Sequence, residues 1–181
     1  MVFYRHIDMG TKILEQYEAI RLGIPDGTPV TVLHIGEQQT VVATGSGAEP
    51  SAAFKLTIGS EKTAAEYFRH HPPTPAEIEN AIAAVEDEIA RVRSATPVAL
   101  FTQDEAIRRI ARIAGLPDQP ELILSRDAVE KIFEHLFAAT RGRPMASESP
   151  DFFSTVLILR EFMHHKQFSS ISIRPSDVFN A

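Results

Sequence analysis

The sequence of 181 residues contains no cysteine and no tryptophan. The lack of cysteine excludes disulfides, thiolate metal sites and a cysteine nucleophile, and it suits the reducing cytoplasm that we expect. Positive charge is scarce, with 18 Lys and Arg against 24 Asp and Glu. A nucleic-acid partner, which needs a basic surface, is therefore not expected. Apolar runs are only a few residues long and no secretory pattern opens the chain, so we expect no membrane association.

The remaining composition is typical of one packed domain. Hydrophobic residues make up 44% of the chain and charged residues 23%, which excludes disorder because enough apolar surface can be buried. No linker or internal repeat divides the sequence. We expect a single domain over residues 1–181, with a helical lead-in over 1–28 and the core over 29–181.

The order of apolar periodicities predicts an α/β fold with a mixed sheet and helices on its faces. A helix is expected over Thr11–Leu22, followed by an antiparallel meander of three strands. Capping boxes at Thr74/Glu77 and Thr102/Glu105 predict two helix starts. The expected strands are Val30–Ile35, Thr40–Thr44, Ala53–Ile58, Pro97–Phe101 and Ser169–Ile173, with Glu121–Leu124 as a further short strand or an extended link. The later expected helices are Arg126–Thr140 and Pro150–His165.

Histidines are the first candidates for chemistry. His34 lies on a strand beside a turn and is suited to a general base or a metal ligand, but a structural role is favoured because no acidic partner is placed near it by sequence spacing. The pairs His70-His71 and His164-His165 have poor chelation geometry, since neighbouring side chains on a helix diverge by about 100°. Interaction with a helix dipole is the favoured interpretation of both pairs.

Two further groups are compatible with phosphate binding. Asp8 and Thr11 belong to an Asp-x-Gly-Thr sequence that resembles a phosphate-gripping loop, but helix capping by Thr11 or Asp8 is the favoured interpretation. Arg108 and Arg112 share a helix face that can hold an anion, but pairing with Glu105 on a solvated face is favoured.

Several segments, taken in order, resemble a known family. Val32–Thr40 reads Val-Leu-His-Ile-Gly-Glu-Gln-Gln-Thr, where the family has a strand ending in Asp-Ile-Gly-Gly-Gly-Ser-Thr. Thr57–Ser60 and Phe101–Ala106 match two later corners, and the likeness covers about residues 14–174. The chain thus resembles the second half of the exopolyphosphatase/guanosine pentaphosphatase (Ppx/GppA) family of the actin-like ATPase superfamily. The resemblance implies a ribonuclease-H-like mixed five-stranded sheet, in β-β-β-α-β-α-β order, with two extra helices before the last strand. It also implies the strand order third-second-first-fourth-fifth.

The departures from the family pattern guide the functional interpretation. Glycines let backbone N–H groups approach a phosphate, yet bulky Glu37-Gln38-Gln39 replace them, and His34 replaces an aspartate. At the second corner Gln103-Asp104-Glu105 put carboxylates at a helix N-terminus, where they repel an anion by about 1 kcal/mol each. The remaining candidates for the phosphate loops are His34, Gly36, Thr40, Gly59 and Thr102.

The sequence therefore favours a non-catalytic, degenerate half-domain that acts as an interaction or regulatory module, without metal or cofactor. In the family, catalytic carboxylates are expected from a first domain to which this sequence has no counterpart. The alternative is a phosphohydrolase or a nucleotide- or polyphosphate-binding protein of the Ppx/GppA type, which would use Mg²⁺. A small-molecule sensor is a third possibility.

A homodimer or a protein partner is also expected. The helix Pro150–His165 carries more apolar residues than a one-faced amphipathic stripe requires, and the seam Ile78–Val92 has coiled-coil-like spacing. Either surface can form a twofold interface. Alternatively, the neighbouring helix Arg126–Thr140 covers these side chains within one chain.

Overall fold

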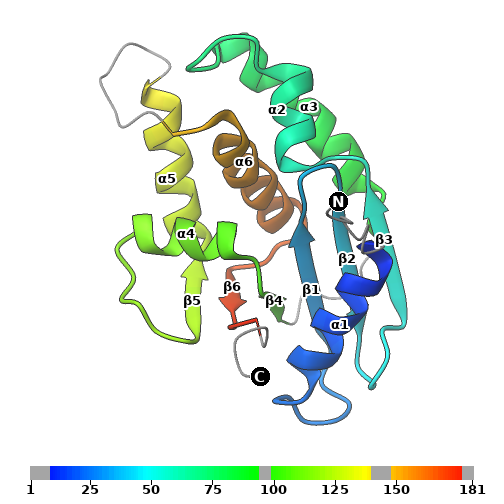
Figure 1. The fold of residues 1–181 in the computed structure, drawn as a ribbon. Coiled ribbons are helices and arrows are strands. Elements are labelled where there is room, and N and C mark those ends of the chain that lie inside the picture. Colours follow the sequence, from blue (N-terminus) through cyan, green and yellow to red (C-terminus); the bar gives the residue numbers. More distant parts are fainter. Residues whose placement is uncertain (1–8, 94–98, 140–147, 177–181) are drawn as a thin grey trace, which may run out of the picture.

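A computed structural model describes residues 9–93, 99–139 and 148–176. One mixed sheet carries helices on both faces (Figure 1). The helices are α1 (Met9–Arg21), α2 (Ser60–Tyr67), α3 (Pro75–Ala90), α4 (Glu105–Ile113), α5 (Arg126–Ala139) and α6 (Pro150–His165). The strands are β1 (Val30–Ile35), β2 (Thr40–Gly45), β3 (Ala52–Leu56), β4 (Leu100–Thr102), β5 (Leu122–Ser125) and β6 (Ser170–Ile173).

The sheet has the order β3-β2-β1-β4-β6-β5. β1 is antiparallel to β2 and parallel to β4, which confirms its expected central place. β4 is parallel to β6, so the first five strands in this list have the order that the resemblance implies. The expected number of five strands is wrong, because β5 pairs antiparallel with β6 and adds a sixth strand at the edge.

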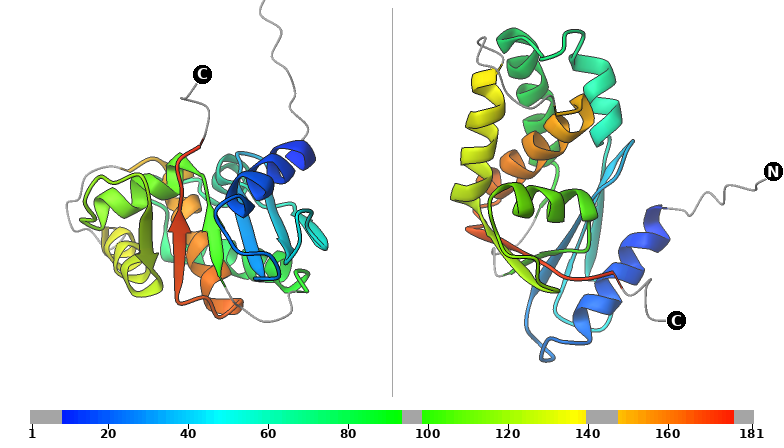
Figure 2. Two further views of the ribbon diagram at one scale, coloured as in Figure 1. Left: turned by 90° about the horizontal axis from the view of Figure 1, so that it is seen from below. Right: turned by 60° about the vertical axis from the view of Figure 1, so that its left-hand side comes forward.

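Among the described helices, α1 is the one that covers the first face of the sheet. Its buried side chains Ile13, Tyr17 and Ile20 pack on apolar residues of β1, β2 and β4. Figure 2 shows α1 on the opposite side of the sheet from α3 and α6. Residues 9–21 of the lead-in therefore belong to the packed layers of the fold.

Helix α6 is the centre of the other face. Its residues 152–159 are all buried, and α2, α3, α4 and α5 contact it from around its circumference. Because Phe153 is 4% exposed and Val85 of α3 is completely buried, both surfaces that suggested a dimer are covered within the chain. The two surfaces therefore cannot serve as an interface, and the homodimer itself stays a prediction. Among the described residues, no helix combines the length and apolar character needed to cross a membrane.

The two expected capping boxes have different outcomes. At α3, the Thr74 hydroxyl accepts from Glu77 N and the Glu77 carboxylate accepts from Thr74 N, as expected. The Thr74 backbone N–H and the His70 side chain lower the pKa of Glu77 to about 2. The second expectation is wrong, because α4 begins at Glu105 with Asp104 as its N-cap, so Glu105 cannot close a box with Thr102.

The turn between β1 and β2 packs directly on the start of α2. The carbonyl of Gly36 accepts from Ser60 N at 2.9 Å, and that of Glu37 accepts from the backbone N–H groups of Glu61 and Lys62 at 3.0 Å. Gly59 lies beneath this turn. A Cβ there would lie 2.4 Å from Gln38 C and 2.5 Å from Glu37 O, so a side chain has no room.

We predict that Gly59→Ala lowers the free energy of unfolding by about 1–3 kcal/mol, because backbone atoms must move to admit the methyl group. Gly47→Ala is the matched control, since the nearest atom to its Cβ is 3.9 Å away. Urea unfolding measures both variants. Equal stabilities of the two would contradict the close contact.

Candidate functional site

Two corners of the chain meet where the parallel strands β1 and β4 end. The first is the turn 36–39 after β1, and the second is the segment from Thr102 to Asp104 that leads into α4. In an open α/β sheet, ligands bind outside the carboxyl ends of the parallel strands. These corners are therefore the candidate site, and both contain residues that the sequence singled out.

His34 and Asp104 form a buried pair that joins the two corners. His34 Nδ1 lies 2.5 Å from Asp104 Oδ1, and the two side chains are 7% and 5% exposed. The second oxygen, Asp104 Oδ2, accepts from Ile35 N at 2.8 Å. This carboxylate therefore satisfies the imidazole and a strand N–H together, which explains why it makes no capping bond to α4.

Several of the chain's own polar groups surround the start of α4, although no side chain caps its first turn. The buried Thr102 hydroxyl accepts from Asp104 N at 3.1 Å, and Gln103 Nε2 donates to the carbonyl of Pro175. Glu105 stands in the first turn and pairs with Arg112 at 2.7 Å. Two carboxylates thus occupy the positive end of the helix, as the sequence predicted.

The turn 36–39 is closed in a different way. Gly36 N donates to the carbonyl of Gln39, and the backbone carbonyls of Gly36 and Glu37 accept from the first N–H groups of α2. Those N–H groups are the donors that a helix offers to an anion. Thr40 is completely buried at the start of β2, and its hydroxyl has no partner among the described residues.

The weaker candidates do not join this site. The expected solvated position of Arg108 is wrong, because its side chain is buried and donates to the carbonyls of Gln119 and Pro120, which anchors the loop after α4. Arg112 pairs with Glu105, as the sequence analysis favoured. Thr11 is exposed on α1, which packs on the face of the sheet opposite α6 (Figure 2). Asp8 lies outside the described residues.

The acidic partner of His34 was missed because it stands 70 positions further along the chain. The sequence did contain a signal for this partner, since the expected strand order places the strand before Asp104 next to the strand that carries His34. The residues that follow two neighbouring parallel strands meet at one edge of the sheet. That rule places Asp104 beside His34.

A separate hollow of about 140 Å³ lies at the other end of β4 and β6. Its lining includes Ala99, Leu100 and residues 167–170, which precede or begin these strands. It therefore opens away from the His34–Asp104 pair. Its serine and glutamine side chains are polar, and no candidate residue contributes to it.

Comparison with solved structures finds extensive similarity. The Ppx/GppA enzyme of Aquifex aeolicus matches 88% of this chain with a TM-score of 0.74 and 17% identity. An exopolyphosphatase-like protein matches 90% with a TM-score of 0.72 and 16% identity. An exopolyphosphatase from Cytophaga hutchinsonii matches 91% with a TM-score of 0.59 and 13% identity.

The match covers only part of these proteins. The chain spans 57% of the Aquifex enzyme, 63% of the exopolyphosphatase-like protein and 58% of the Cytophaga enzyme. No family model matches the sequence, and a search of curated proteins finds no relative. This chain therefore has the actin-like fold of the Ppx/GppA proteins over somewhat more than half of their length.

Proposed function

We propose that this chain is a non-catalytic, degenerate Ppx/GppA-like half-domain that serves as an interaction or regulatory module. One observation carries the proposal: the chain's own carbonyls take the helix donors at one corner, and its own carboxylates stand at the helix start of the other. Backbone carbonyls of the turn 36–39 take the N-terminal N–H groups of α2. At the start of α4, the buried His34–Asp104 pair and the Glu105 carboxylate place negative charge beside the helix, whose first turn has no side-chain cap.

Electrostatics support the same conclusion. An incoming phosphate would meet the exposed carboxylate of Glu105, which repels a unit negative charge about 4 Å away by about 1 kcal/mol in bulk water and by more near a protein surface. It would also have to displace carbonyl oxygens from α2, because each N–H group offers only one proton. An anion thus gains little at either corner. A fold can persist without the activity of its relatives, since function depends on the site rather than on the architecture.

The alternative is a phosphohydrolase of the Ppx/GppA type that uses Mg²⁺. The His34–Asp104 pair favours it, because a carboxylate that orients an imidazole is a common arrangement of a general base. In this alternative His34 would activate a water molecule. Burial of both side chains opposes it, since a base must reach its substrate.

We expect ATP, guanosine pentaphosphate and polyphosphate with Mg²⁺ to bind with a Kd weaker than about 1 mM, which corresponds to only about 4 kcal/mol. Calorimetry measures the affinity, and release of inorganic phosphate measures turnover. Turnover that both His34→Ala and Thr40→Ala remove would establish the alternative. Micromolar affinity for ATP would also contradict the proposal.

We also predict that Asp104→Ala lowers the free energy of unfolding by about 3 kcal/mol, because His34 and the Ile35 N–H lose their buried partner. Glu105→Ala is the control, since its side chain is 70% exposed, and we expect a change of about 0.5 kcal/mol. Denaturant unfolding compares the two. Equal stabilities would mean that the pair is not structural and would favour the alternative.

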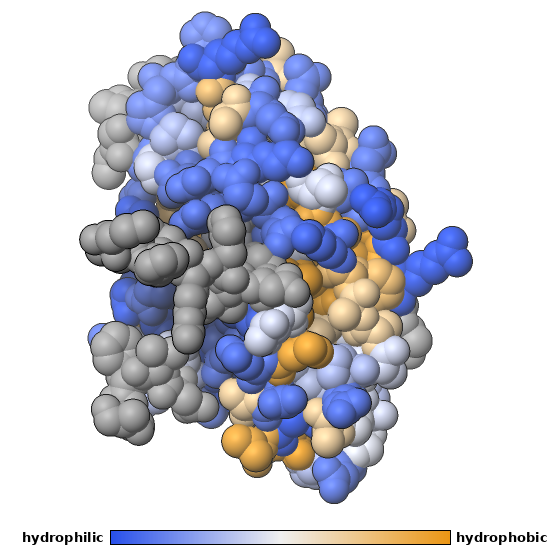
Figure 3. Space-filling model, turned by 45° about the vertical axis from the view of Figure 1, so that its right-hand side comes forward, coloured by the Kyte–Doolittle hydropathy of each residue, from blue (hydrophilic) through white to orange (hydrophobic). Residues whose placement is uncertain are grey.

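The assembly of this module is part of the proposal, and a homodimer is the form that we propose. Large apolar side chains remain exposed outside α3 and α6, most of all Leu22 at 89% and Ile123 on the edge strand β5 at 68%. Figure 3 shows apolar residues gathered on one part of the face that it presents. The lack of cysteine keeps the cytoplasm as the proposed location.

Light scattering at tens of micromolar protein tests the assembly, and a dimer has twice the 20.0 kDa of one chain. A mass near that of one chain would refute it. Substitutions in the two surfaces that first suggested a dimer, such as Phe153→Glu in α6 and Val85→Glu in α3, cannot test an interface. Both side chains lie in the core, and a charge there would unfold the chain.

A further inference from the structure

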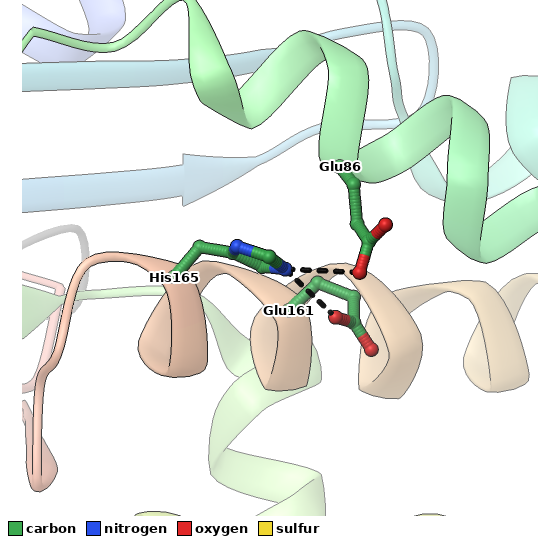
Figure 4. Close-up of side chains that lie close together, drawn as sticks. All are labelled: Glu86, Glu161 and His165. Carbon is green, nitrogen blue, oxygen red and sulfur yellow. Dashed lines mark hydrogen bonds and ion pairs between the residues drawn. The ribbon is translucent and has the colours of Figure 1, made fainter.

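Three metal-ligating side chains meet on the outer surface of α3 and α6, away from the corners of the sheet. Glu161 and His165 are one turn apart on α6, and Glu86 reaches them from α3 (Figure 4). His165 Nε2 lies 3.0 Å from Glu86 Oε1 and 3.5 Å from Glu161 Oε2. The three ligand atoms all lie within 4.8 Å of one another.

These spacings suit a common ion. Nitrogen and oxygen ligands about 2.0–2.2 Å from a zinc ion, at angles of about 90–110°, are roughly 3.0–3.5 Å apart. Both measured distances from His165 Nε2 fall in this range. All three ligand atoms lie within 4.8 Å of one another, so rotation of the Glu86 and His165 side chains can bring them to one ion.

Neighbouring groups hold Glu161 in place. It is 2% exposed, and its other oxygen, Oε1, contacts Arg160. Arg160 is itself clasped by Glu130, through Nε at 2.7 Å and through its second terminal nitrogen at 3.0 Å. Such support of a ligand's second oxygen is typical of metal sites and fixes the direction of the first.

The local charge also fits a divalent cation. Glu130 balances the charge of Arg160, which leaves the carboxylates of Glu86 and Glu161 with neutral His165 as a set of charge −2. Lys166, the next residue along the chain, donates to the carbonyl of Val92 instead. The side chains of His165 and Glu86 are 39% and 42% exposed, so an ion has a path to the site and water can complete its coordination.

The geometry points to a surface site for a divalent transition-metal ion of the zinc class, held by Glu86, Glu161 and His165. An imidazole combined with carboxylates selects such ions over Mg²⁺ and Ca²⁺, which prefer oxygen ligands alone. The bound ion links α3 to α6. This site is independent of the corners and of the function proposed for them.

Without a metal, the same atoms form an ordinary network of hydrogen bonds and ion pairs. The two cases differ in one measurable respect, because a network has no specific affinity for zinc. Titration of tag-free protein, first treated with EDTA, therefore separates them. We expect one Zn²⁺ per chain with a Kd of about 10 µM or tighter, a higher melting temperature with Zn²⁺, and no saturable binding of Mg²⁺.

Variants locate the ion. Glu86→Gln and His165→Gln should each weaken Zn²⁺ binding at least tenfold, since each removes one of three ligands. Asp87→Asn and His135→Gln are the controls, because they remove an exposed carboxylate and an exposed imidazole outside the cluster. We expect both controls to bind zinc as the parent protein does.

The melting temperature of each variant in EDTA shows that it remains folded. Co²⁺ adds a second readout, because coordination by an imidazole and two carboxylates gives visible absorption that His165→Gln should abolish. Three results would overturn the site: no stoichiometric Zn²⁺ binding at about 100 µM, binding that survives both cluster variants, or binding that the control variants weaken equally.

Discussion

The contact between the turn 36–39 and the first turn of α2 is the constraint on which the candidate site depends. Backbone packs on backbone there, because Gly59 has no side chain and two carbonyls of the turn accept from three N–H groups of the helix. The contact fixes the end of the β1–β2 hairpin. It also uses the donors with which α2 could otherwise bind an anion.

The second corner follows the same principle with side chains. Asp104 gives one oxygen to His34 and the other to the N–H of Ile35, so its carboxylate continues the hydrogen bonding of β1 beyond the last pairing with β4. Both corners thus contribute to the stability of the sheet. The chain shares the fold of the Ppx/GppA proteins, and we propose that its own groups disfavour a ligand at these two corners.

Much of this fold is predictable from local patterns. Val30–Ile35 and Pro150–His165 have the predicted bounds, because turn residues delimit the strand and a proline begins the helix. The sixth strand was uncertain, since Leu122–Ser125 has only four residues and gains its pairing from β6. The helix Arg126–Thr140 was named as one possible cover of α6, and α5 does pack on it. The contacts from α2, α3 and α4 were not predicted, because apolar excess shows that a helix is covered but not by what. The partners His34 and Asp104 are likewise joined only by tertiary structure.

The most direct measurement is an amide NMR titration with phosphate and Mg²⁺-ATP up to about 5 mM. The amides of Gly36, Gly59 and Thr102 report on the two corners separately. If the chain's own groups fill both corners, these resonances show no saturable shift below about 1 mM. Saturable shifts at all three amides with one shared micromolar Kd would show an open phosphate site and contradict the proposed loss of phosphate binding.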